Sequence, residues 1–175
     1  MLQPTTDWHW YCDKQYLMLS LKHNLQFQTA YNIGRLLNVP ADKQFFSMLD
    51  SERYMQLAEQ LEASHLNVGA AEMTQILLNA IAAITFHKPV TLRSWYFCEQ
   101  NHAGAIRQLA SLENQDGKGN VLILEQEQHV ATCMVISQSL ILNANKQLQK
   151  FELVKVMKNR LIPYIAPAKQ LSQTA

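Results

Sequence analysis

Cysteine is scarce in this sequence, and no apolar run is long. The three cysteines, Cys12, Cys98 and Cys133, lie far apart and form no C-x-x-C pair, so they fit neither a disulfide framework nor a zinc site and suit a reducing compartment. The longest largely apolar run, residues 76–86, is interrupted by Asn79 and Thr85 and falls short of the roughly 20 residues that a membrane-spanning helix needs. The first residues lack the charged and apolar regions of a signal peptide. We therefore expect a cytoplasmic protein that contacts no membrane.

The signatures of catalysis and of metal binding are also missing. The 6 histidines stand singly, without an H-x-x-x-H or H-E-x-x-H pattern. The G-K-G at residues 117–119 lacks the rest of a phosphate-binding loop, and a hairpin turn is the better interpretation. No G-x-S-x-G motif occurs. We predict a protein that is not an enzyme and that binds no metal and no cofactor.

The charge is small overall but unevenly distributed. A net charge of +1 argues against general binding of nucleic acid. Residues 1–86 carry 5 bases and 8 acids, a net charge of −3, whereas residues 87–175 carry 10 bases and 6 acids, a net charge of +4. The C-terminal half therefore suggests a locally acidic partner.

The first half of the chain shows strand patterns and then helix patterns. Three strands of a meander are predicted, at residues 8–12, 16–21 and 25–27. Three helices follow, at residues 29–38 with Thr29 as the cap, at 51–62 with Asp50 as the cap, and at 68–86 with Asn67 as the cap. The last helix is apolar nearly all round in its second half, so we expect it in the core.

The second half reads as a small antiparallel sheet or barrel. Its predicted strands are residues 94–98, 121–125, 130–136 and 139–143, with a turn at 114–120. The spacing of Leu153, Val154, Met157 and Leu161 predicts a terminal helix over residues 151–162.

These patterns predict an α+β fold with two domains. An N-terminal α/β domain is expected over residues 1–88. A C-terminal domain, a small twisted β-barrel-like sheet with the terminal helix, is expected over residues 89–175. A mobile tail is expected from about residue 167.

Two aromatic stretches have both a structural and a functional interpretation. Trp8 and Trp10 fall on one face of a strand, where they either fill the core or line an apolar pocket together with Leu19. In "HKPVTLRSWYF", residues 87–97, Pro89 ends the preceding helix, and the rest is either a joint between domains or a binding surface. The bases at Lys88 and Arg93 favour the binding surface.

Three blocks of the sequence resemble the ZapC family, the Z-ring-associated cell division proteins of gamma-proteobacteria. The blocks are "DWHWYCDKQYLMLSL…LQF", "ILLNAIAAITFHKPVTLRSWYF" and "LVKVMKNRLIP", which contain the patterns W-x-W-Y, L-N-A-x-x-A-I, K-P…S-W-x-F and K-x-M-x-x-R-L-x-P. They occur in the family's order and spacing. Residues 39–66 and 99–147 match poorly, and no site is carried over there.

The resemblance implies a non-enzymatic protein that binds FtsZ, the tubulin-like division GTPase, and promotes lateral bundling of its protofilaments at the division site. It also implies an N-terminal α/β region, a C-terminal twisted β-barrel-like domain, and one apolar pocket on each, the second with a basic rim. Leu19 matches the family's strand leucine of the first pocket. The family's bases match at Lys88, Lys155 and Arg160, and at Arg93, where the family has lysine.

On the predicted terminal helix, Arg160 and Lys158 border the apolar stripe, whereas Lys155 points to the opposite side and is the weaker candidate. Trp95 lies beside two cations and is either a core residue or a contact, and Lys88 also suits the end of a helix.

We expect the partner to be FtsZ filaments or a short acidic and apolar peptide of FtsZ, bound by a monomer or a weakly self-associating protein. A small-molecule-binding or catalytic domain that uses the same apolar pockets is the alternative, and nucleic-acid binding is a third.

Overall fold

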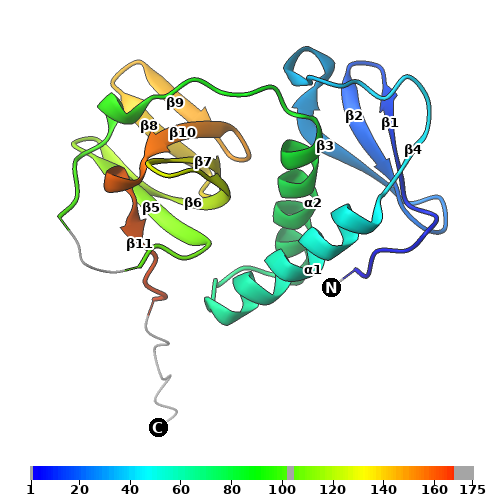
Figure 1. Ribbon diagram of the computed structural model, residues 1–175, viewed down its shortest axis with the longest axis horizontal. Coiled ribbons are helices and arrows are strands. Elements are labelled where there is room, and N and C mark those ends of the chain that lie inside the picture. The colour runs from blue at the N-terminus through cyan, green and yellow to red at the C-terminus, as the bar shows by residue number, and fades with distance from the viewer. Residues whose placement is uncertain (1, 102–104, 168–175) are drawn as a thin grey trace, which may run out of the picture.

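The structure is a computed structural model that describes residues 2–101 and 105–167. The predicted mobile tail falls outside these residues from residue 168 onward. Figure 1 shows two groups of strands, one from each half of the chain, with helices between them. The α+β class and the order of an α/β region before a strand-rich region are confirmed. In the described residues, no helix combines the length and the apolar composition that crossing a bilayer requires.

The N-terminal half consists of one antiparallel sheet and two helices. The predicted meander is confirmed, since strands β1 (His9–Asp13), β2 (Tyr16–Ser20) and β3 (Gln26–Asn32) pair in sequence order. The short strand β4 (Gln44–Phe45) adds to the free edge of β1, which gives the order β3-β2-β1-β4.

Helix α1 (Met48–Ala63) begins three residues before its predicted start. Its cap is Ser47, whose Oγ accepts a hydrogen bond from the backbone N–H of Asp50. The Asp50 carboxylate in turn accepts from the Ser47 N–H, which completes a capping box. Asp50 is therefore part of the cap, as the third helical residue and not as the N-cap itself.

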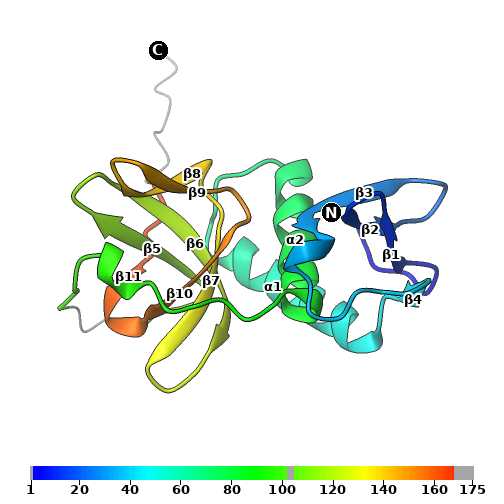
Figure 2. The same cartoon turned by 90° about the horizontal axis from the view of Figure 1, so that it is seen from above.

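Helix α2 (Ala70–Phe86) is the central element of the molecule; it ends at the predicted residue but begins two residues later than predicted. Its N-cap is Gly69, so the prediction of Asn67 as the cap is wrong. Its residues 76–83 are all buried. In both views α2 lies between the N-terminal sheet and the C-terminal strands, so it is covered on opposite sides (Figures 1 and 2). The buried Asn79 satisfies the backbone of β3, since its Oδ1 accepts from the N–H of Ala30 at 2.8 Å.

The C-terminal half contains a five-stranded sheet of order β10-β7-β6-β5-β11 and a separate hairpin. The sheet strands are β5 (Leu109–Asn114), β6 (Gly117–Gln126), β7 (Val130–Val135), β10 (Leu153–Met157) and β11 (Ile162–Pro163). Strands β8 (Ser139–Asn143) and β9 (Lys146–Gln149) form the hairpin. The hairpin expected over residues 114–120 is confirmed, but its turn is at residues 115–116, and the G-K-G motif itself lies in β6, where it pairs with β5.

This sheet is buried on both faces. Along β6, Leu122 packs into the core around α2, whereas Val121 and Ile123 pack into a second core that includes the hairpin residues Leu140 and Leu148. Neighbouring strand residues point to opposite faces, which explains the alternation. The two halves of the chain therefore share the core around α2. The division into domains at residue 88 stays a prediction.

Three predicted elements are wrong. Residues 29–38 form no α-helix, because their first part belongs to β3, where Thr29 and Tyr31 are buried at the period of two that is typical of a strand. The 3-10 helix η1 (Ile33–Arg35) follows it. Residues 94–98 form no strand but contain the 3-10 helix η2 (Ser94–Tyr96).

The predicted terminal helix is the third error. Residues 151–162 contain β10, the 3-10 helix η3 (Lys158–Arg160) and the start of β11. Val154 and Val156 pack into the second core and pair with Cys133 and Ala131 of β7. Because these β-branched residues alternate with Lys155, the segment suits a strand, although its apolar spacing also fits a helix.

Candidate partner-binding surface

The segment over residues 92–97 lies along the outer edge of β10, the edge strand of the five-stranded sheet. Leu92 forms a parallel bridge with Lys155, and the N–H of Arg93 donates to the carbonyl oxygen of Lys155 at 2.8 Å. The buried Ser94 accepts from the N–H of Met157 through its Oγ at 2.7 Å. The segment therefore satisfies backbone groups that an edge strand otherwise exposes.

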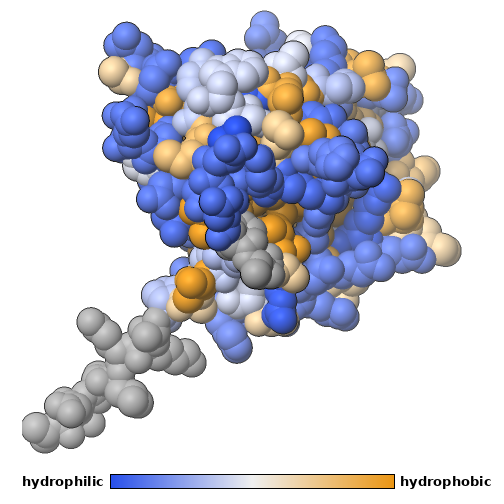
Figure 3. Space-filling view, turned by 60° about the vertical axis from the view of Figure 1, so that its left-hand side comes forward, coloured by the Kyte–Doolittle hydropathy of each residue, from blue (hydrophilic) through white to orange (hydrophobic). Residues whose placement is uncertain are grey.

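Apolar side chains emerge where this segment meets β10. Trp95 is 69% exposed, and Leu92 and Met157 are each 38% exposed. The turn of η2 buries Ser94 and turns Trp95 outward, with the Trp95 ring 5.6 Å from that of Tyr96. We call the surface formed by Leu92, Arg93, Trp95, Lys155, Met157, Lys158 and Arg160 the Trp95 patch. Figure 3 brings the C-terminal half forward and shows hydrophobic side chains in small groups among hydrophilic ones.

Two cations of the Trp95 patch are available to a partner. The side chains of Arg93 and Lys158 make no hydrogen bond and no ion pair with the residues that the structure describes. Both are only partly buried. A cation in this state binds an acidic group without first breaking another pair.

The other two cations are held in place by acids. Lys155 Nζ lies 2.6 Å from Glu127 Oε1, and Arg160 Nη2 lies 3.3 Å from Glu99 Oε1. Arg160 also donates from Nη1 to the carbonyl oxygen of Phe97 at 3.2 Å, which links η3 to the end of η2. Both acids are largely exposed, so these pairs contribute little stability and the patch keeps an excess of positive charge.

Lys88 lies apart from the Trp95 patch. Its Nζ donates to the carbonyl oxygen of Gly34 at 2.9 Å, and its backbone N–H donates to the carbonyl oxygen of Arg35. These contacts hold Lys88 against the N-terminal half, at the start of the linker that Figure 1 shows crossing to η2. The structure therefore brings together five of the six residues predicted for the basic site.

Lys155 is placed differently from its predicted position. In β10, Lys155 and Met157 point away from the second core, opposite to Val154 and Val156. The argument that put Lys155 on the far side of a helix from Arg160 is wrong, because the helix does not form. Lys155 is an equal member of the patch.

Trp8, Trp10 and Leu19 are in the core around α2. The ring of Trp10 meets the ring of Phe86 edge-on at 5.4 Å, and all three residues are almost fully buried. These residues were expected either to fill the core or to line an apolar pocket, and their burial agrees with the core role. A pocket at this position that binds a partner stays a prediction.

Leu92 and Met157 belong to the patch but were not predicted as site residues. Leu92 stands within "HKPVTLRSWYF", next to Arg93, and its position in that stretch was the available signal. Met157 was assigned to the apolar stripe of the terminal helix, so it was interpreted as a buried residue.

The described residues include no group of three or more His, Cys, Asp or Glu side chains that could hold a metal ion. Among the thiols, burial raises the pKa of Cys133 to about 12 and also raises the pKa of Cys12. These two thiols are therefore poor nucleophiles at neutral pH. The Trp95 patch offers an aromatic ring, the side chains of Leu92 and Met157, and four cations.

Family models of cell-division protein ZapC match nearly the whole chain. The N-terminal model matches residues 1–88 and the C-terminal model matches residues 89–166. The N-terminal match therefore includes residues 39–66 and the C-terminal match includes residues 99–147, the two stretches outside the three motif blocks.

Relatives named cell division protein ZapC align over almost their full length. The one from Pseudoalteromonas atlantica is 44% identical over 167 residues, which are 93% of this chain and 94% of the relative. Those from Aeromonas hydrophila and Tolumonas auensis are 32% and 31% identical, over 93% and 100% of this chain and 92% and 99% of the relatives. The resemblance seen in the three sequence blocks is therefore confirmed, and the chain belongs to the ZapC family of cell-division proteins.

Proposed function

We propose that this protein is a non-enzymatic cell-division protein that binds FtsZ and promotes lateral bundling of its protofilaments at the division site. Membership of the ZapC family supports the role in cell division. The Trp95 patch supports a surface for a protein partner. The partner contact we assign to this patch is a short segment of FtsZ with apolar anchors and acidic groups.

The observation that carries this proposal is the exposure of Trp95 between cations. Tryptophan and arginine dominate the binding energy of protein interfaces, and an exposed tryptophan side chain loses unfavourable contact with water when a partner covers it. Arg93 and Lys158 belong to the same patch, are only partly buried, and have no side-chain partner among the described residues. Because these cations lie on a solvent-accessible rim, binding is sensitive to salt.

Co-sedimentation with GTP-assembled FtsZ across a salt series tests the proposal. We expect the parent protein to sediment with FtsZ at low salt and progressively less as the salt concentration rises. Arg93→Glu should weaken co-sedimentation by about tenfold or more, because it replaces an unpaired rim cation by an anion. The matched control is Lys22→Glu, a charge reversal at an exposed residue that lies outside the patch, between β2 and β3.

The proposal is wrong if the Arg93→Glu protein folds normally and still bundles FtsZ as well as the parent. If the protein instead binds DNA of arbitrary sequence, and this binding falls steeply as the salt concentration rises, nucleic acid is the better candidate for the ligand. Bundling needs two contacts with filaments, made through two sites or through self-association. Sedimentation velocity of the protein alone, at the concentration used for bundling, distinguishes these two routes.

A further inference from the structure

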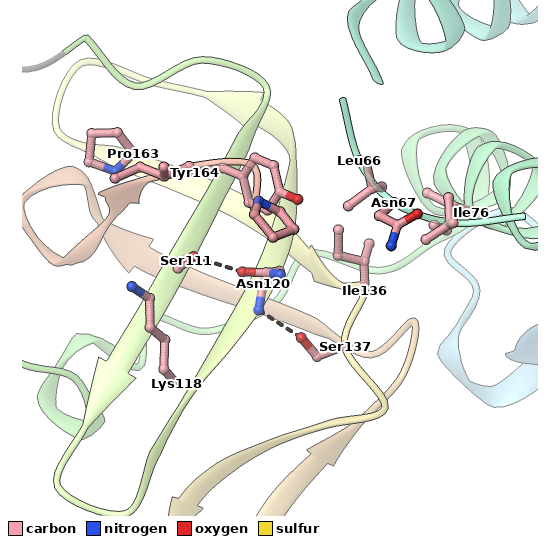
Figure 4. Close-up of a pocket in the computed structure, with 13 residues that line it drawn as sticks. Leu66, Asn67, Ile76, Ser111, Lys118, Asn120, Ile136, Ser137, Pro163 and Tyr164 are labelled. Atoms are coloured by element: carbon pink, nitrogen blue, oxygen red, sulfur yellow. Dashed lines mark hydrogen bonds between the residues drawn. The ribbon is translucent and has the colours of Figure 1, made fainter. Parts of the chain in front are cut away.

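A pocket of about 410 Å³ lies between the two halves, away from the Trp95 patch. Its N-terminal side is the connection from α1 to α2 together with Ile76 of α2, and its C-terminal side is formed by β5, β6 and the chain after β7 (Figure 4). Tyr164 and the residues around it pass along the same pocket. The volume is in the range of pockets that hold small organic ligands.

One wall of this pocket is apolar. Leu66, Val68, Ile76 and Ile136 contribute aliphatic side chains to it. Ile165, which also lines the pocket, is 84% exposed. An exposed isoleucine beside an apolar wall is energetically unfavourable in water, and an apolar ligand group would shield it.

The opposite wall presents hydrogen-bond donors. Ser111 Oγ donates to Asn120 Oδ1 at 2.8 Å, and Ser137 Oγ accepts from the backbone N–H of Asn120 at 2.8 Å. The amide Nδ2 of Asn120 has no hydrogen-bond partner among the described residues, and the Ser137 hydroxyl keeps its hydrogen to donate. Asn120 Oδ1 and Ser137 Oγ, at the centre of Figure 4, thus each already accept a hydrogen bond, while the Asn120 amide and the Ser137 hydroxyl remain available as donors.

The charge at the pocket is positive and unpaired. Lys118 lines it, and its ammonium makes no ion pair or hydrogen bond with the residues that the structure describes. Glu113 faces Lys118 across the β5–β6 pair without forming an ion pair. None of the described residues that line the pocket is an aspartate or a glutamate.

We propose that this pocket binds a small organic carboxylate with an apolar body. The carboxylate accepts hydrogen bonds from the Lys118 ammonium and the Asn120 amide, which suit an anion because charge-assisted hydrogen bonds are the stronger ones. The apolar body packs on Leu66, Val68 and Ile165, three apolar lining residues that are not buried. This inference is independent of FtsZ binding, since it uses none of the residues of the Trp95 patch.

Isothermal titration with 3-phenylpropanoate and with its neutral amide, 3-phenylpropanamide, tests the proposal on the full chain. We expect the parent to prefer the carboxylate by about tenfold, which corresponds to one charge-assisted contact. Lys118→Gln should abolish that preference and leave the affinity for the amide unchanged. The control Lys22→Gln removes a charge outside the pocket and should behave as the parent. Val68→Trp fills the apolar side and should remove the binding of both compounds.

Three results would overturn the inference. They are no binding of 3-phenylpropanoate to the parent, an undiminished preference in Lys118→Gln, and unchanged binding in a folded Val68→Trp protein. If Val68→Trp does not fold, the inference is still tested by comparing the affinities for the carboxylate and the amide in the parent and in Lys118→Gln.

Discussion

The hydroxyl group of Tyr31 donates a hydrogen bond to the backbone carbonyl oxygen of Phe151 over 2.9 Å, and it also lies 3.4 Å from the sulfur of Met134. This contact joins β3 of the N-terminal half to the turn before β10 in the C-terminal half. Phe151 has a φ of 70°, a left-handed conformation that is uncommon for a residue of its size. Its N–H donates to the carbonyl oxygen of Val135, so both of its backbone polar groups are held by hydrogen bonds.

Tyr31→Phe should lower the free energy of unfolding by about 1–3 kcal/mol, because it removes the hydroxyl group that donates a hydrogen bond to the carbonyl oxygen of Phe151. Urea unfolding measures the difference. Tyr16→Phe is the control, since the Tyr16 hydroxyl is exposed and makes no hydrogen bond with the described residues. Equal midpoints for Tyr31→Phe and the parent would show that the contact contributes nothing.

Leu122→Ala should destabilise the whole molecule by about 2–5 kcal/mol, because Leu122 fills the core that the two halves share around α2. We expect one cooperative transition, with tryptophan fluorescence and far-UV circular dichroism giving the same midpoint. Ile141→Ala, at an exposed position of β8, should change the stability little. Separate midpoints for the two signals in Leu122→Ala would mean that the halves unfold independently.

The free energy of unfolding should fall as the pH drops below about 6.5 through the titration of His87. Burial lowers the pKa of His87 below its usual 6.5, and the nearby cations Arg35 and Lys88 lower it further, against the hydrogen bond to the Lys88 carbonyl, which raises it. The unfolded chain therefore takes up a proton at a higher pH than the folded chain does. Stability from this group is complete above the unfolded pKa and is lost as the pH falls.

Urea unfolding at pH 7.5, 6.5 and 5.5 measures this effect. His87→Gln should flatten the dependence on pH, whereas His129→Gln, at an exposed position, should leave it unchanged. An identical pH dependence in His87→Gln and the parent would remove His87 as the cause.

The cysteines should react with a thiol reagent at different rates in the native state. Cys98 is exposed, whereas Cys133 is fully buried with a pKa raised to about 12. At pH 8, Ellman's reagent should modify Cys98 first and Cys133 only after unfolding. Cys98→Ser should remove the fastest phase. A fast phase that persists in this variant would contradict the burial of Cys133 or the partial burial of Cys12.

Trp95→Ala should weaken binding to FtsZ filaments by about tenfold or more, because the indole is the largest apolar group of the Trp95 patch. The change in stability should be small, since 69% of the residue is exposed. Ile141→Ala removes another exposed apolar side chain and should bind as the parent does. Unchanged co-sedimentation of a folded Trp95→Ala protein would exclude the patch as the contact.

The two long helices could be predicted because each has a local signal that the fold does not override. Apart from Asn79, residues 76–83 are apolar over more than two turns, and Pro89 just beyond the helix prevents its extension. For α1, the apolar face of Tyr54, Leu57, Ala58 and Leu61 was enough to locate the helix, and these residues are buried. The N-cap was predicted three residues too late, at Asp50, because Asp50 is the second member of a capping box whose N-cap is Ser47.

The site was harder to predict because its residues take their positions from tertiary contacts. Ser94 forms a turn, where a strand was predicted, because its hydroxyl accepts from Met157 in a strand 63 positions later. The terminal bases were proposed as site residues through the family resemblance, and that assignment stays a prediction. Their arrangement was derived from a helix, but this segment pairs with β7 and forms a strand instead. Local spacing alone does not reveal such a partner.

Because α2 is packed on opposite sides, the two halves have no freedom to turn about the linker without exposing buried leucine and isoleucine side chains. In the bundling that we propose, the protein would therefore act as a spacer of fixed length rather than as a tether. Two filaments held by contacts on opposite halves would lie at a constant distance, and electron micrographs of the bundles would show one regular spacing at every ratio of protein to filament.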